Sequence, residues 1–143
     1  MKFYTGTLVL ILFTVPACTE TFDAEYSSLQ VAREKNAVKT GLVPNWLPET
    51  SQQIKVTYDL DTNEIILAFQ YKITEGWNPP LICNPIGPFD PPEPKLKRSW
   101  WPQDVPANHF SAYRHTYYNC KKGNSFLAIL PDVGEAFYWN TRD

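Results

Sequence analysis

The chain has 143 residues, a length that is enough for one modest globular domain. Its formal net charge at pH 7 is −2. This charge argues against a nucleic-acid-binding protein, because such proteins usually carry a basic patch or stripe. Proline is frequent, with 13 residues against 6 glycines, and aromatic residues make up 15% of the chain. We therefore expect a rigid, irregular connection somewhere in the chain, together with strands.

The first 17 residues have the organisation of a secretory signal peptide. Lys2 gives a positive start, Leu8 to Phe13 form an apolar run, and small residues follow that run. The run is short for a membrane-spanning helix, which needs ~20 apolar residues. We expect residues 1–17 to be a signal peptide, and the alternative is a buried N-terminal helix or strand.

The end of this segment resembles the lipobox of bacterial lipoproteins, with Val15, Pro16, Ala17 and Cys18 at its four positions. The resemblance implies that Cys18 receives a diacylglyceryl thioether and becomes the acylated N-terminus of a cell-envelope protein. Thr19 replaces the Asp that often retains such proteins in the inner membrane, so the resemblance implies the outer membrane, facing the periplasm. Pro16 departs from the pattern and leaves open cleavage without lipid, which would give a secreted periplasmic protein.

The two remaining cysteines, Cys83 and Cys120, would lie in an oxidising compartment. We predict that they form a disulfide, with two unpaired buried thiols as the alternative. His109, His115 and Cys120 lack any recognised ligand spacing for a metal ion. We therefore expect no metal site and no cofactor.

The mature chain is expected to begin with a tether at residues 18–24, followed by a single domain at residues 25–143. Ser27 and Gln30 match the spacing of a capping box. Residues 28–40 are predicted to form a helix that ends before Gly41.

Two strands with alternating apolar residues follow this helix. The alternating positions are Ile54, Val56, Tyr58 and Leu60 in the first strand, and Ile65, Leu67, Phe69 and Tyr71 in the second. A hairpin with a two- or four-residue loop around residues 62–63 would pair Leu60 with Ile65 and Tyr58 with Leu67. Both apolar sets then share one face of the sheet, and a one-residue slip would give a poorer core.

Residues 36–64 also carry a family resemblance, in the sequence NAVKTGLVPNWLPETSQQIKVTYDLDTNE. With the strand around Phe69 and the C-terminal AFYW, this segment resembles small exported proteins and lipoproteins of bacteria. Their shared pattern is Gly-x-x-Pro and Leu-Pro with a Trp, then an Ile strand, then Asp-x-Asp-Thr-Asn. The resemblance implies a self-standing exported domain, and it implies no catalytic residue.

Nine of the prolines lie in residues 76–108, which excludes helix and central strand from this segment. We expect an ordered flap that the disulfide holds in place. Lys97 and Arg98 lie beside Trp100 and Trp101 in this flap, and these residues are a candidate partner patch or interfacial anchor. The alternative, which we favour, is that the tryptophans cover the sheet while the charges face water.

The last third of the chain is predicted to be an antiparallel meander, with strands in residues 111–120, 125–130 and 135–140. The middle strand has apolar residues at successive positions, as in a central strand covered on both faces. The expected fold class is α+β, with an N-terminal helix packed on an antiparallel sheet of about five strands and a long Pro-rich loop.

The sequence contains none of the common catalytic motifs, so we expect no enzyme and no catalytic residue. His115 alternates with Tyr113 and Tyr117, so packing in the core or on the sheet surface explains the presence of this histidine. The first functional hypothesis is a lipid-anchored envelope protein that binds another protein, as an accessory subunit, an inhibitor or an immunity factor. The second is a glycan or small-ligand binding module at the cell wall, in which Tyr117, Tyr118, Trp139 and the loop tryptophans stack on sugar rings.

Overall fold

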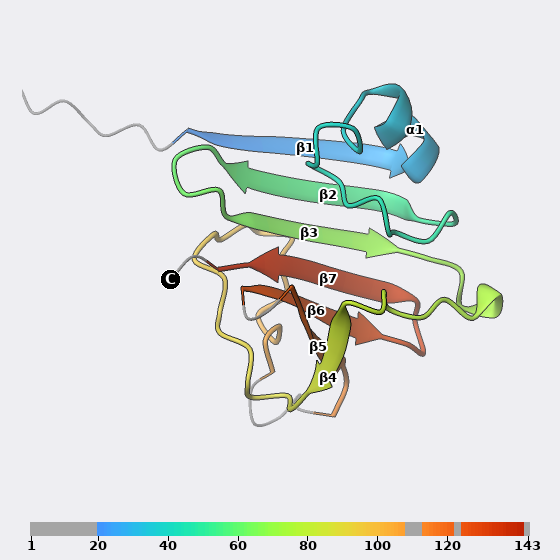
Figure 1. Cartoon of the computed structure of the whole chain (residues 1–143), viewed down its shortest axis with the longest axis vertical. Helices are drawn as coiled ribbons and strands as arrows, with labels where there is room; N and C mark the ends of the chain where they lie inside the picture. The colour runs from blue at the N-terminus through green and yellow to red at the C-terminus, as the bar shows by residue number, and fades with distance from the viewer. Residues whose placement is uncertain (1–19, 108–112, 122–123, 142–143) are drawn as a thin grey trace, which may run out of the picture.

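The computed structural model describes residues 20–107, 113–121 and 124–141. These residues form one antiparallel sheet of seven strands in the order β1-β2-β3-β7-β6-β5-β4 (Figure 1). The strands are β1 (Thr21–Ser28), β2 (Gln52–Asp59), β3 (Ile65–Gln70), β4 (Cys83–Ile86), β5 (Thr116–Cys120), β6 (Ser125–Leu130) and β7 (Glu135–Asn140). The helices are α1 (Leu29–Glu34) and the short 3-10 helix η1 (Ile73–Glu75). Within the described part of the chain, no helix is both long and apolar enough to cross a membrane.

The expected α+β class is therefore wrong, because the protein is mainly β. The sheet has seven strands where about five were expected, and its helix α1 is only six residues long. The two additional strands are β1 and β4, which form the two edges of the sheet. Strand β1 occupies most of the expected tether, so the folded domain includes residues from Thr21 onward. Strand β4 contains Pro85, which an edge strand tolerates.

Helix α1 is shorter than the predicted helix over residues 28–40. Its N-cap is Ser28, whose hydroxyl accepts a hydrogen bond from the Val31 N–H at 3.2 Å, so the cap lies one residue after the predicted one. Asn36 has a φ of 59°, in the left-handed region, and the chain then continues in turns through Gly41. The apolar residues of 28–40 form no continuous helical stripe, and Ala37 is buried in the turns that follow the short helix.

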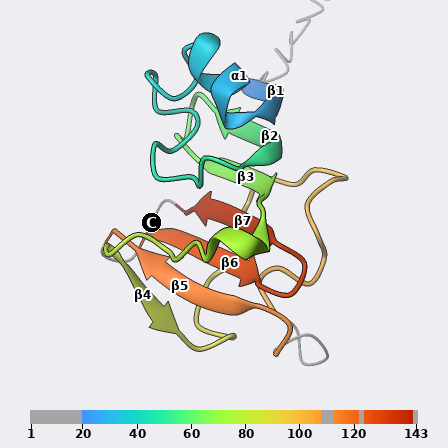
Figure 2. The same cartoon turned by 90° about the vertical axis from the view of Figure 1, so that its right-hand side faces the viewer.

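The sheet has an apolar layer on each face. Helix α1 and residues 37–47 cover the first face, where the buried side chains include Leu29, Val43 and Leu47. The Pro-rich segment, residues 76–107, covers the second face with Leu96, Trp101 and Val105. Figure 2 shows these two covers on opposite sides of the strands. Strand β6 alternates between the two layers, which confirms that it is a central strand with both faces covered.

The β2–β3 hairpin has the predicted shared face but a different register. Tyr58 lies opposite Ile65, and Val56 lies opposite Leu67, which is a shift of two residues from the prediction. A two-residue shift keeps every side chain on its face, so the apolar sets still meet. Asp59 sets the register of the hairpin. Its carboxylate accepts hydrogen bonds from the Asp61 and Thr62 N–H groups, both at 2.9 Å, and this closes the turn before Leu60 can pair with β3.

The meander β5-β6-β7 pairs as the sequence predicts, and β7 then pairs with β3. In this junction Ile66 lies opposite Trp139 and Phe69 lies opposite Ala136. The Asn140 side chain locks the same junction, since its Oδ1 accepts from the Ile65 N–H at 2.7 Å and its Nδ2 donates to the Asn63 carbonyl at 3.1 Å. The two halves of the chain therefore form one continuous sheet.

Candidate binding surface

The candidate patch of lysine, arginine and tryptophan is divided by the fold. Trp101 is buried, with its ring centroid 5.7 Å from that of Phe137 and 5.8 Å from that of Trp139. Its Nε1 donates to the Val105 carbonyl at 2.8 Å. Trp100 is half-buried against Trp101, with the centroids 6.0 Å apart. These two tryptophans cover the second face of the sheet, as the favoured alternative holds.

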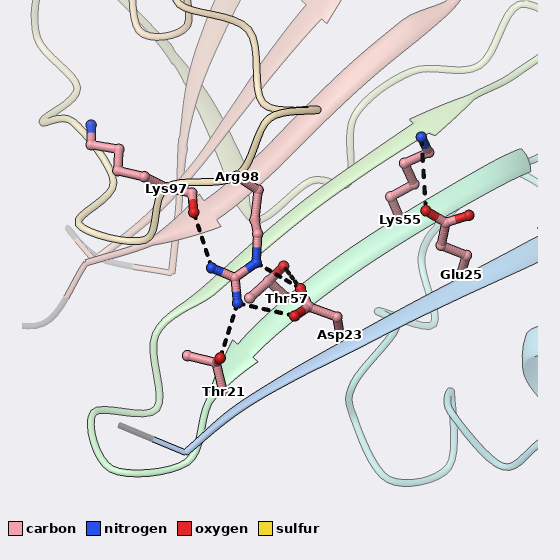
Figure 3. Close-up of polar contacts among 7 residues, drawn as sticks. All are labelled: Thr21, Asp23, Glu25, Lys55, Thr57, Lys97 and Arg98. Atoms are coloured by element: carbon pink, nitrogen blue, oxygen red, sulfur yellow. Dashed lines mark hydrogen bonds and ion pairs between the residues drawn. The ribbon is translucent and has the colours of Figure 1, made fainter. Parts of the chain in front are cut away.

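Arg98 connects the Pro-rich segment to β1 (Figure 3). Its Nε and Nη2 donate to the two carboxylate oxygens of Asp23 at 2.8 and 3.0 Å, and Nη2 also donates to the Thr21 hydroxyl at 2.9 Å. Asp23 accepts a further hydrogen bond from the Thr57 hydroxyl on β2. The hydrogen bonds from Arg98 and Thr57 lower the pKa of Asp23 below its ordinary value. Arg98 thus holds an edge strand in place.

Lys97 remains at the surface. Its side chain points away from the Arg98 contacts in Figure 3 and forms an ion pair with Glu93 at 3.2 Å. A depression of about 370 Å³ lies beside it, lined by charged and proline residues together with part of Trp101. Of the four residues in the candidate patch, only Lys97 is exposed.

Cys83 and Cys120 are joined by a disulfide, the pairing that the sequence predicts. The two residues lie opposite each other on β4 and β5, and both are buried in the apolar layer of the first face. The bond therefore attaches the edge strand β4 to the meander. Cys18 and His109 lie outside the described residues.

His115 is buried beside the rings of Tyr117 and Phe137, each with its centroid 6.0 Å away. Burial lowers the pKa of its imidazole, and the charge of Arg114 lowers it further, against the opposite effects of Asp104 and Glu135. In the described residues, its Nδ1 has no hydrogen-bond partner and no group of three His, Cys, Asp or Glu side chains could hold a metal ion. This environment agrees with a packing role.

The aromatic residues proposed to stack on sugars are mostly inaccessible. Trp139 and Tyr117 are buried in the second-face layer, and burial raises the pKa of Tyr117 to about 12. Tyr118 is half-buried on the other face. A ligand therefore cannot stack on this set of rings together.

A different aromatic groove lies on the first face, with a volume of about 550 Å³. We call it the Trp46 groove, and its aromatic residues are Trp46, Tyr58 and Tyr138. The ring centroids of Trp46 and Tyr138 are 5.4 Å apart, and Trp77 stacks on Trp46 with centroids 6.3 Å apart. The groove brings together residues from the 38–46 segment, the β2–β3 loop and the end of β7.

Polar groups line the same groove, namely the amides of Asn45, Asn63 and Asn140 and the exposed side chain of Lys121. The Tyr58 hydroxyl donates to the Asn63 side chain, and the Asn140 amide is held by β3 and the β2–β3 loop. These contacts fix the positions of the Asn63 and Asn140 amides before any ligand binds. A preformed groove with half-buried rings and fixed amides is suited to binding.

Sequence reasoning did not select the Trp46 groove. Trp46 lies between Pro44 and Pro48, and this position indicates a fixed, irregular segment rather than a surface loop. Tyr138 alternates with two buried residues of β7, so its half-exposure depends on what covers the sheet. The only sequence signal was the Trp within the resemblance pattern.

A family model described as the YbbD head domain matches residues 20–70, about a third of the chain. The matched segment contains β1, α1, β2 and β3, and it ends before the Pro-rich segment. The match fits a small protein of the bacterial cell envelope. No curated protein and no solved structure matches the chain.

Proposed function

We propose that the chain is a cell-envelope protein anchored by lipid at Cys18, and that its domain works by binding another protein. In this proposal the domain is an accessory subunit, an inhibitor or an immunity factor at the outer membrane, facing the periplasm. Strand β1 begins at Thr21, three residues after Cys18. A chain extends at most ~3.6 Å per residue, so a lipid at Cys18 would hold the sheet close to the membrane.

The Trp46 groove is the observation that carries the binding proposal. Protein interfaces are enriched in Trp and Tyr at their centre and are polar at their rim. The groove has this composition, with Trp46, Tyr58 and Tyr138 beside three amides and Lys121. The side chain of Ile82 is 49% exposed and lines the groove, which adds an apolar contact at its margin.

Two neighbouring residues give a matched pair of variants for testing this proposal. Ile82 lines the groove, whereas Leu81 is fully exposed and is not among the groove residues. Both lie just before β4, and each change to Asp alters an exposed apolar side chain, so both variants should fold.

The test is crosslinking in intact cells, followed by purification from detergent-solubilised envelopes. We expect one specific partner with the wild type and with Leu81→Asp, and its loss with Ile82→Asp. The absence of a specific partner in the wild type would contradict protein binding. Equal recovery with both variants would contradict the Trp46 groove as the binding surface.

The same groove supports a second proposal, in which the ligand is a glycan. Aromatic rings beside fixed amides suit a sugar, whose ring has an apolar face and hydroxyl groups at its edge. Titration with peptidoglycan fragments and common saccharides should then change the intrinsic tryptophan fluorescence through Trp46. Fluorescence that stays flat across these ligands would contradict the glycan proposal and leave the protein-binding proposal intact.

A further inference from the structure

Strand β1 is a long edge of the sheet with an open side. It has eight residues and pairs only with β2 among the described strands. Figure 1 shows helix α1 above the C-terminal part of β1, whereas no described helix or strand lies above its N-terminal part. An edge of this kind can pair with a strand from another chain.

The hydrogen bonds of β1 show which of its backbone groups face outward. The Glu20 carbonyl accepts from the Leu60 N–H at 3.0 Å, so the backbone of Glu20 points toward β2. Successive residues of an antiparallel strand point to opposite sides. The N–H and C=O groups of Thr21, Asp23 and Glu25 therefore point away from the sheet, where a further strand would bind.

The two edges of the sheet differ in how they are protected. Strand β4 has only four residues and contains Pro85, both of which limit pairing with another chain. Strand β1 contains neither proline nor lysine. Of the two edges, β1 is the one that can accept another strand.

An apolar pocket of about 500 Å³ lies on the first face beside this edge. Phe22 and Tyr26 of β1 line it together with Leu60 and Leu42. Phe22 is 48% exposed and Leu60 is 54% exposed, so the pocket is open to solvent. A strand that binds to an edge gains affinity from backbone hydrogen bonds and specificity from pockets for its alternate side chains.

Pairing of β1 with the β1 of a second copy is disfavoured by charge. Antiparallel self-pairing must oppose outward-facing residues, which are the odd-numbered ones. In the three central registers Asp23 lies opposite itself, Asp23 lies opposite Glu25, or Glu25 lies opposite itself. Parallel in-register pairing sets each acid beside its own copy. Like charges directly opposite each other destabilise a strand pair, so these registers favour a different chain as the partner.

We propose that an extended segment of a partner protein binds to the open side of β1 as an eighth strand. The segment places an apolar side chain in the pocket beside Phe22 and a cationic side chain opposite Glu25. This inference rests on the proposed protein-binding function and names the form of the partner.

The charges around the edge leave Glu25 available to such a cation. Asp23 is held by Arg98, with both carboxylate oxygens engaged. Within the described ranges of the chain, the one ion pair of Glu25 is a distant one with Lys55 at 3.8 Å, and its side chain is largely exposed. A second cation can therefore approach Glu25 without displacing Arg98.

Amide hydrogen exchange of the whole mature protein tests this inference. In the free protein, the outward N–H groups of Asp23 and Glu25 should exchange faster than the inward groups of Ala24 and Tyr26. The probe is a capped peptide of about nine residues that alternates Val or Leu with Lys or Thr. Its addition should slow exchange at the outward groups by about tenfold or more. Unchanged exchange at these groups would overturn the inference.

Variants of Glu25 separate backbone pairing from charge. Glu25→Pro removes an outward N–H that the sheet does not use, so it should prevent peptide binding while the inward amides of β1 remain protected. Glu25→Lys should weaken binding of the lysine peptide and favour a peptide with Glu in place of Lys. Peptide binding that is equal in the wild type and in both variants would overturn the inference, as would equal binding of a peptide N-methylated on its pairing side.

Photocrosslinking in intact cells separates this inference from the proposed function. A photoreactive residue is placed at Ser27 in one variant and at Ile82 in another. Capture of the same partner from Ser27 supports strand addition. Capture from Ile82 alone contradicts strand addition but supports the binding function, and capture from neither position contradicts both.

Discussion

Arg98 has a structural role that its sequence neighbours conceal. In the sequence it belongs to a run of basic and aromatic residues, but in the structure its side chain binds Thr21 and Asp23 of the edge strand β1. The guanidinium group presents several donors in one plane, which suits a carboxylate with two oxygens. A residue from the Pro-rich segment thereby fixes the first strand of the sheet.

We predict that Arg98→Ala frees β1 from the Pro-rich segment. Loss of the contacts to a largely exposed carboxylate should cost roughly 1 kcal/mol in the free energy of unfolding. Amide exchange of the inward N–H groups of β1 should become faster. Lys97→Ala is the matched control, because the Lys97 side chain is exposed, and it should leave β1 unchanged. Equal effects of the two variants would contradict the role of Arg98.

The contacts of Arg98 with Asp23 make a contribution to the free energy of unfolding that depends on pH. The pKa of Asp23 is lower in the folded protein than its ordinary value. Its stabilising contribution is therefore present above the unfolded pKa of about 3.9 and is lost as the pH falls through the folded pKa. In Arg98→Ala this part of the acid dependence should decrease.

We predict that His115 makes the free energy of unfolding depend on pH in a higher pH range than Asp23 does. Burial lowers the pKa of its imidazole, so the unfolded chain takes up a proton before the folded protein does. The free energy of unfolding should therefore fall as the pH decreases below about 6.5. His115→Phe keeps a ring beside Tyr117 and removes the titration, so its stability should change less between pH 8 and pH 5. Chemical denaturation at both pH values measures this, and parallel losses in the two proteins would contradict the assignment.

At the scale of elements, the Pro-rich segment covers the second face of the sheet and also supplies its edge strand β4. Residues 96–105 bury Leu96, Trp101 and Val105 on the second face, and Cys83–Ile86 pair with β5 as the last strand. The disulfide adds a covalent bond to the pairing of β4 with β5. This arrangement explains how a segment with so many prolines becomes ordered.

We predict that reduction of the disulfide destabilises the domain. The bond joins residues separated by 37 positions, and loop-closure entropy gives a stabilisation of roughly 3–4 kcal/mol for a loop of that length. Amide exchange should increase first in β4 and then in β5. The double variant Cys83→Ser with Cys120→Ser should show the same loss and no further response to reductant. An unfolding midpoint of the wild type that is unchanged by reductant would contradict this prediction.

At the scale of the whole molecule, the proposed lipid anchor at Cys18 would be chemically independent of the disulfide. We predict that labelled palmitate enters the wild-type protein and that the protein sediments with membranes. Cys18→Ser should abolish the label and release a soluble periplasmic form, with Cys83 and Cys120 still bonded. Non-reducing mass spectrometry checks both outcomes. An N-terminus without lipid mass, or Cys18 bridged to another cysteine, would contradict the anchor.

The sequence alone determined the features that depend on alternation and on local turns. The shared face of β2 and β3, the meander β5-β6-β7 and the two-faced burial of β6 all follow from residues that are close in the chain. The pairing of Cys83 with Cys120 followed from assigning Cys18 to the lipid, which left two cysteines. These features can be predicted because a period of two places side chains on a face whatever the rest of the chain does.

Tertiary structure decided which segments pair across long distances and which rings remain accessible. Strand β1 has few buried side chains, so its strand character depends on the hydrogen bonds that β2 offers. Trp101 is buried and Trp46 is half-exposed only because of what lies beside each of them. Pairing of β3 with β7 joins segments about 70 residues apart, and no local pattern records such contacts. The candidate groove forms at that junction, so only the folded chain reveals it.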